Sequence, residues 1–192
     1  SEMCIRDRNI DMMKRSMMQT VFLLVFLLYP LCAGASVIQE KVYDICKYGA
    51  KGDGKTLNTN AINSAIEYCA ENGGGTVLIP KGTFLSGTIY LKDNISLVLR
   101  KGAVLKGTAD VSQYKSYTPL GNLSMFDSGG DGENANSAID PHWNRALILG
   151  VGVSNISIEG EGIIDGNHVF DSEGEENMRG PHTIIIAESR NI

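Results

Sequence analysis

The chain has 192 residues, 17 of them basic and 22 acidic, so its formal net charge is −5. It is 43% hydrophobic and 20% charged, which is too apolar for a disordered chain and too polar for a protein with several membrane spans. The acidic balance argues against a general nucleic-acid-binding protein, which needs a basic face. The length fits one domain.

The first 35 residues predict processing rather than part of the fold. Residues 1–11 match no structural pattern and are interpreted as non-native read-through upstream of the true start. Residues 12–35 have the organisation of a signal peptide: the basic pair Lys14-Arg15, then the apolar run VFLLVFLL at 21–28, then the A-x-A cleavage pattern at 33–35. A single membrane anchor is the alternative, but the run is shorter than the ~20 residues that a span requires.

Cleavage leaves a mature chain, residues 36–192, with 13 basic and 19 acidic residues and a net charge of −6. We expect it to be secreted or periplasmic, without stable membrane association. It keeps two cysteines, Cys46 in a strand-like segment and Cys69 on the apolar face of a predicted helix. An exported protein can hold a disulfide, but two buried thiols are favoured here. No cysteine–histidine spacing predicts a zinc site.

The mature chain is predicted to open with one strand and one helix. The strand covers residues 42–48. The helix covers residues 60–71, where apolar residues at helical spacing form one stripe: Ala61, Ile62, Ala65, Ile66, Cys69 and Ala70. The side chain of Asn58 or Thr59 is expected to cap its start, and the glycines at 73–75 are expected to end it.

Short apolar segments, separated by glycine, Asp-Asn or Lys-Gly, follow the helix and predict successive strands. They are residues 77–79, 83–85, 88–91, 95–99, 103–105, 146–149, 155–158, 162–165 and 183–186. A β-sandwich has turn signals every 8–12 residues or so, which is wider than this spacing. The pattern predicts an all-β solenoid, in which short parallel strands of each coil stack on the next coil.

An internal repeat supports the solenoid. The sequence NISL at 94–97 returns as NISI at 155–158 and begins again at Asn191-Ile192. Alternation at Ile95, Leu97 and Leu99 places one face inside the coil. The Asn-x-Ser matches at Asn94, Asn122 and Asn155 are formal glycosylation sequons, but Asn94 and Asn155 are expected at coil corners, where the side chain bonds to the turn.

Residues 109–145 interrupt the repeat with a segment rich in Ser, Asn, Asp and Gly. A long insertion in a solenoid is usually a surface loop, often on the binding side. Its acidic residues suggest calcium, but Gly129 and Ala138 stand where an EF-hand needs ligands, so we predict no metal and no cofactor. Trp143 is expected to anchor the loop, with stacking on a sugar as the alternative.

Residues 49–56, GAKGDGKT, match the G-x-x-x-x-G-K-[ST] pattern of a phosphate-binding loop and stand between a strand and a helix. Two observations oppose that function. The helix begins a few residues late for an N-terminus that holds phosphates, and a solenoid follows in place of alternating strands and helices. Nucleotide binding is therefore a remote alternative.

Together these segments resemble the N-terminal part of a pectinase-type right-handed parallel β-helix, specifically glycoside hydrolase family 28, the polygalacturonases. The matching stretches are residues 43–54 (YDICKYGAKGDG), 60–82 (NAINSAIEYCAENGGGTVLIPKG), 83–107, 155–166 (NISIEGEGIIDG) and 178–183 (MRGPHT). The first stretches are shared by many pectin-active and tailspike β-helices, whereas GIIDG with MRGPH points to the bacterial polygalacturonase-like group.

The resemblance implies hydrolysis of α-1,4-galacturonosyl linkages in pectin with inversion, which requires one carboxylic acid and one carboxylate that activates water. That family carries its chemistry in N-x-D, D-D, G-H-G and R-I-K motifs on later coils, and residues 36–192 contain none of them. We therefore expect a truncated β-helix with one capping α-helix and no catalytic residue in this chain.

Two groups of residues are candidates for a site. Arg179 can bind a carboxylate bidentately, and His182 lies three residues later, so both are candidates for binding the acidic substrate pectin. An acidic run offers material for a catalytic pair, but a solvated loop with a turn at Asp165 is the favoured interpretation; the run is Glu159, Glu161, Asp165, Asp171, Glu173, Glu175 and Glu176. A polysaccharide-binding protein of the tailspike type and a pectin lyase on the same fold remain as alternatives.

Overall fold

The structure is a computed structural model that describes residues 41–117, 120, 144–172 and 180–192. The chain divides into two units, Ser1–Gln39 and Glu40–Ile192, and every described residue lies in the second. The predicted read-through segment, the signal peptide and most of the predicted insertion therefore lie outside the described residues. Within the described part of the chain, no helix is long and apolar enough to span a membrane.

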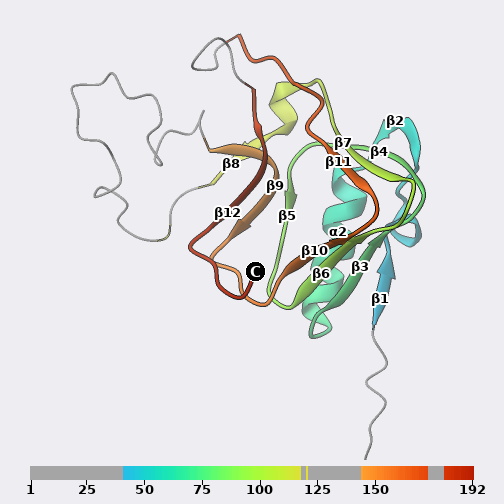
Figure 1. The fold of residues 1–192 in the computed structure, drawn as a ribbon, viewed down its shortest axis with the longest axis vertical. Coiled ribbons are helices and arrows are strands. Elements are labelled where there is room, and N and C mark those ends of the chain that lie inside the picture. Colours follow the sequence, from blue (N-terminus) through green and yellow to red (C-terminus); the bar gives the residue numbers. More distant parts are fainter. Residues whose placement is uncertain (1–40, 118–119, 121–143, 173–179) are drawn as a thin grey trace, which may run out of the picture. The chain divides into compact units, whose positions relative to one another are not determined.

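Three sheets of mainly parallel strands make up the second unit, and successive strands of the chain pass from one sheet to the next (Figure 1). Sheet A pairs Val42–Asp44 (β1), Gly75–Ile79 (β3), Ile95–Leu99 (β6) and Ser157–Gly160 (β10), in that order. Sheet B pairs Asp53–Leu57 (β2), Gly82–Ser86 (β4), Ala103–Gly107 (β7) and Ile163–Asp165 (β11). Sheet C pairs Ile89–Tyr90 (β5), Arg145–Val151 (β9) and His182–Ala187 (β12). This coiling confirms the predicted all-β solenoid.

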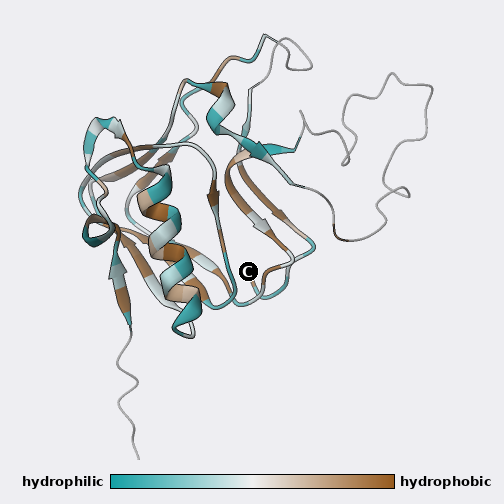
Figure 2. Ribbon diagram, turned by 180° about the vertical axis from the view of Figure 1, so that it is seen from behind, coloured by the Kyte–Doolittle hydropathy of each residue, from teal (hydrophilic) through white to brown (hydrophobic). Residues whose placement is uncertain are grey.

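The core lies between the three sheets, because the strands pair in register and stack their inward side chains in columns. In sheet C, Ile89 lies opposite Ile148, which lies opposite Ile184. Ile89 and Ile148 are fully buried. Figure 2 shows the strands largely hydrophobic and many of the turns hydrophilic, as the alternation in the sequence predicts.

The helix Thr59–Glu71 (α2) covers the first coil, as predicted. It follows β2 and precedes β3, so it takes the place in the chain where later coils have a strand of sheet C. Ile62, Ala65, Ile66 and Cys69 are fully buried in the same core as the strands. The apolar stripe of α2 therefore closes the N-terminal end of the core.

The start of α2 differs from the expectation. Asn58 is the residue before the helix, but its side chain makes no capping hydrogen bond. Its Oδ1 accepts from Lys51 N–H at 2.7 Å, and its Nδ2 donates to the Thr56 carbonyl at 2.7 Å. The amide therefore holds the preceding turn in place. At the other end, Gly74 N–H donates to the Cys69 carbonyl at 2.9 Å, which confirms the glycine terminator.

One corner of the solenoid, which the chain reaches after α2, β5, β9 and β12, is built from left-handed residues. Gly74, Asn94, Asn155 and Asn191 have φ angles of 89°, 60°, 56° and 55°. Asn155 Nδ2 donates to Asn94 Oδ1 at 2.9 Å, and Asn191 Nδ2 donates to Asn155 Oδ1 at 2.9 Å. The predicted corner position of the asparagines is confirmed, but their side chains bond to one another across coils rather than to their own turns.

The predicted first strand, residues 42–48, is wrong in its second half. Only β1 is extended, and Ile45–Tyr48 forms a 3-10 helix (η2), because the Asp44 side chain accepts from Cys46 N–H at 2.9 Å and starts a turn. The turn also leaves Cys46 exposed, whereas Cys69 is buried; both are free thiols. The prediction of two buried thiols is therefore correct for Cys69 alone.

Candidate functional site

The corner between sheets B and C carries both long connections of the solenoid. The chain passes from sheet B to sheet C three times: through residues 87–88 after β4, residues 108–144 after β7 and residues 166–181 after β11. The two long connections therefore emerge at the same corner on successive coils. A rigid scaffold with long loops gathered at one corner is a common arrangement for a binding site.

The described start of the first long connection is fixed to the coil. It runs through Val111–Gln113 (η3) to Lys115–Ser116 (β8), which pairs antiparallel with the first residues of β9. Thr88 Oγ1 donates to the Ala146 carbonyl at 2.6 Å and accepts from Lys115 N–H at 2.7 Å. This part of the connection is thus paired with sheet C through β8, so the position at which the connection leaves the coil is fixed.

Tyr114 is a second residue that fixes this connection to the coil. Its ring is 4% exposed, and its hydroxyl donates to the Thr108 carbonyl at 2.7 Å. Burial, with a smaller contribution from the nearby Asp165 carboxylate, raises the pKa of Tyr114 to about 12. Tyr114 therefore stays protonated and keeps donating this hydrogen bond at physiological pH.

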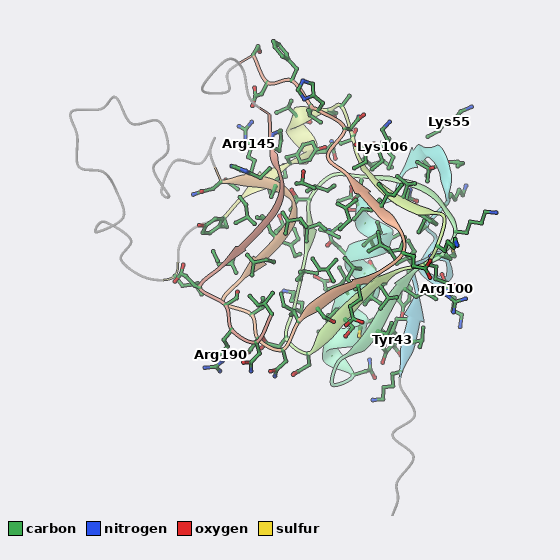
Figure 3. All side chains as sticks on the ribbon, viewed as in Figure 1. Tyr43, Lys55, Arg100, Lys106, Arg145 and Arg190 are labelled. Carbon is green, nitrogen blue, oxygen red and sulfur yellow. The ribbon has the colours of Figure 1, made fainter. Side chains whose placement is uncertain are left out.

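A partly buried ion pair ties the second connection to β9. Arg145 Nη1 lies 3.0 Å from Asp171 Oδ2, and the two side chains are only 23% and 9% exposed. Figure 3 places Arg145 at the start of β9, at the opposite end of sheet C from Arg190. Asp171 was expected in a solvated loop, and that expectation is wrong for this residue because Arg145 balances its charge in the protein.

The two predicted substrate-binding residues have different outcomes. Arg179 lies outside the described residues. His182 is the first residue of β12, lies opposite Ala146 and is partly buried, so the structure brings it to the same end of sheet C as Arg145. The sequence reasoning missed Arg145, although a basic residue directly before the apolar run 146–149 was a usable signal.

The members of the acidic run that the structure describes do not gather at one place. Glu161 lies between β10 and β11, where it pairs at 3.8 Å with Lys101 on a solvent-exposed surface. Asp165 ends β11, accepts from Asn167 N–H at 2.8 Å and lies 3.9 Å from Lys106 Nζ. Asp165 therefore makes the predicted turn. Glu173, Glu175 and Glu176, like Trp143, lie outside the described residues.

In the segment that matches a phosphate-binding loop, backbone N–H groups donate to side chains of the protein itself. Asp53 Oδ1 accepts from Lys55 N–H at 2.9 Å and Thr56 N–H at 2.8 Å, and Asn58 accepts from Lys51 N–H. The bonds to Asp53, with that from Thr56 N–H the strongest cause, lower the pKa of this carboxyl group to about 2. Three backbone donors of this segment, the N–H groups of Lys51, Lys55 and Thr56, are therefore already bonded to side-chain oxygens. Residues 53–57 form β2, so the geometry opposes nucleotide binding.

Among residues 41–117, 120, 144–172 and 180–192, the structure contains no cluster of three or more histidine, cysteine or acidic side chains that could hold a metal ion. The residues considered for calcium in the predicted insertion lie outside these ranges.

The stacked coils, the capping helix and the parallel pairing of the strands define a parallel β-helix. A family model described as rhamnogalacturonase A/epimerase, pectate lyase-like, matches residues 42–185. The chain belongs to this family.

The relatives narrow the class further. The chain is 39% identical over 128 residues to an exo-poly-α-D-galacturonosidase of Dickeya chrysanthemi, a match that covers 66% of this chain and 20% of that protein. The family 28 exopolygalacturonase of Yersinia enterocolitica is 30% identical with a TM-score of 0.53, over 70% of this chain and 22% of that one. The exopolygalacturonase of Thermotoga maritima is 25% identical with a TM-score of 0.50, over 70% and 26%. The chain thus spans about a fifth to a quarter of the length of these three relatives, each of which is named as a galacturonan-cleaving exo-enzyme.

Proposed function

We propose that this chain is the N-terminal portion of a secreted, pectin-degrading glycoside hydrolase that cleaves α-1,4-galacturonosyl linkages. The observation that carries the proposal is the family match over residues 42–185 together with 39% identity to an exo-poly-α-D-galacturonosidase. The β-helix, with both long connections at one corner, is a suitable scaffold for an extended polysaccharide.

The mechanism we propose is inverting hydrolysis, in which one carboxylic acid protonates the leaving oxygen and one carboxylate activates water. The N-x-D, D-D and G-H-G motifs expected to supply these groups are absent from residues 36–192. We therefore assign the catalytic carboxylates to sequence outside residues 1–192, and we expect the chain alone to be inactive.

Binding of a polyanion to an acidic chain requires local cations. The corner between sheets B and C offers Lys115 on the described residues, and the sequence adds Arg179 and His182 as candidates. Lys106 is paired with Asp165 at 3.9 Å. Arg145 is neutralised by Asp171, so its part in the proposal is to hold the corner in shape.

The activity is tested on polygalacturonate with two proteins: residues 36–192, and the longest natural protein that contains them. The proposal is supported if the longer protein releases reducing ends and residues 36–192 do not. An unsaturated product that absorbs in the ultraviolet would instead assign a lyase, and binding without cleavage by the longer protein would assign a tailspike-type binding protein. Reducing ends released by residues 36–192 above a heat-treated control would contradict the expected inactivity.

Export is tested separately. We expect a protein expressed from Met12 in a bacterium to appear outside the cytoplasm with Ser36 as its first residue, since residues 12–35 have the organisation of a signal peptide. Sequencing of the mature N-terminus decides this point, and a cytoplasmic product that retains residues 21–28 would contradict it.

A further inference from the structure

The turn that follows β11 holds two consecutive non-glycine residues in the left-handed region. Asn167 has φ 60° and His168 has φ 45°. Such backbone conformations cost free energy for side chains other than glycine, and asparagine and histidine are among those that tolerate them best. The hydrogen bond from Asn167 N–H to Asp165 Oδ1 fixes the turn.

The residues after the turn are fixed on the inner side. Val169 packs against the hydrophobic core, and Asp171 is 7% exposed and paired with Arg145 at 3.0 Å. Gly180 lies so close to the Val169 carbonyl that a Cβ atom at position 180 would collide with it. Both the inward residues and the backbone of this segment are therefore held in place.

The outer side of the same segment presents two aromatic side chains to solvent. His168 is exposed and Phe170 is 63% exposed, and they flank the inward Val169. Single exposed apolar residues are ordinary on protein surfaces. Phe170 differs from such residues because its backbone is held in place, the imidazole of His168 is nearby, and it lies at the corner where both long connections emerge.

The chemistry of the pair suits one acidic sugar ring. The face of a phenylalanine ring packs against the C–H face of a pyranose, and an imidazole N–H donates to a carboxylate or hydroxyl oxygen. Lys106 Nζ lies 3.9 Å from Asp165 Oδ2 at the end of β11 and offsets the charge of that carboxylate, which would otherwise repel an anion.

We propose that His168 and Phe170 form a binding subsite for one uronic acid residue of an acidic polysaccharide, with Phe170 packing against the ring and His168 bonding to the carboxylate. The inference rests on the proposed function, because it supposes a galacturonate-containing ligand. To the proposed function it adds the place where one sugar binds and separate roles for the two residues that bind it.

The test uses calorimetry to measure affinity for a galacturonate oligosaccharide and for its methyl ester. Three variants are compared with the wild-type protein. Phe170→Ala should weaken binding of both ligands roughly tenfold, since packing on the ring does not depend on charge. His168→Asn keeps a residue that tolerates the left-handed backbone, and it should weaken binding of the acid about three- to fivefold with little effect on the ester. Ile163→Ala is the matched control, because Ile163 is 58% exposed on the neighbouring strand β11 and should leave both affinities unchanged.

The outcomes separate the two proposals. Wild-type protein that binds the acid and loses this binding in Phe170→Ala but not in Ile163→Ala supports the subsite. Wild-type binding that is unchanged in Phe170→Ala overturns the subsite and leaves the proposed function standing. Wild-type protein that binds neither ligand contradicts the proposed function and, with it, the subsite. Far-ultraviolet circular dichroism and thermal melting of each variant verify that the fold is kept.

Discussion

The first and last coils of this solenoid bury similar side chains to very different extents. At the N-terminal end, α2 covers the core, and its Ile62 and Ile66 are fully buried. In the last coil, Ile184 is 41% exposed, although it lies opposite the fully buried Ile148 in a paired strand. The difference shows that pairing within a coil does not by itself bury its side chains, because the neighbouring coil on each side supplies the cover.

Stability in such a fold is approximately a sum of the contributions of each repeat and of its contacts with adjacent repeats. The comparison between covered and uncovered positions therefore predicts different costs for the same substitution in different coils. Sheet C and the asparagine corner each contain a column in which one residue type recurs from coil to coil.

The largest effect is expected in the column of sheet C. Ile148→Ala removes a fully buried side chain between two coils and should lower the free energy of unfolding by about 2–5 kcal/mol. Ile184→Ala, one strand further along the same column, should cost less than about 1 kcal/mol because Ile184 is already 41% exposed. Chemical denaturation of both variants measures this; equal costs would mean that Ile184 is covered in solution.

The asparagine corner should give a smaller effect. Asn155 joins two hydrogen bonds to Asn94 and Asn191 and has φ 56°. Asn155→Ala loses both bonds and places alanine in a left-handed conformation, so we expect a cost of about 2 kcal/mol. Asn191→Ala also places alanine in a left-handed conformation, at φ 55°, but loses only one bond of the column, so it should cost about 1 kcal/mol less than Asn155→Ala.

Asn155→Gly separates the two causes, because glycine accepts the left-handed backbone but makes no side-chain bond. Its cost should fall between that of wild type and that of Asn155→Ala when measured by the same denaturation. If Asn155→Gly is as stable as wild type, the hydrogen-bonded column contributes nothing, and the asparagines serve the backbone alone.

The sequence predicted the parts of the fold that depend on periodicity. The stripe of α2 and the alternation in strands such as β6 are strong because each buries one face. The repeat of NISL predicted recurring coils, and the structure pairs the two copies so that Ser96 lies opposite Ser157. Strand β2 escaped prediction because Asp53–Leu57 has no apolar alternation, and its pairing with β4 depends on contacts distant in sequence. The exposed Cys46 was missed for a local reason, the hydrogen bond from its N–H to the Asp44 side chain.

The candidate site was less predictable than the fold. His182 was singled out from a short motif, and the structure places it at the end of sheet C where Arg145 lies. The pairing of Arg145 with Asp171 joins residues 26 positions apart across a long connection, and no local pattern reports such a contact. The conformation of His168 is equally hidden, since a left-handed backbone at a non-glycine residue depends on the turn that surrounds it.

The smallest effect concerns the N-terminal edge of sheet B, where β2 depends on a charged group. Asp53 accepts from Thr56 N–H at 2.8 Å, from Lys55 N–H at 2.9 Å and from Thr56 Oγ1 at 2.7 Å, and these bonds lower its pKa to about 2. In the unfolded chain an aspartate has a pKa of about 3.9, so the folded state favours the ionised form. This contribution to stability is therefore present above about pH 4 and is lost as the pH falls toward 2.

We expect Asp53→Asn to be slightly less stable than wild type at pH 6 and to approach wild type at pH 2, in denaturation measured at several pH values. Thr56→Val, which removes only the hydroxyl donor, should give a smaller change of the same sign. A difference between wild type and Asp53→Asn that stays constant from pH 6 to 2 would mean that the ionised carboxylate does not stabilise this edge of the sheet.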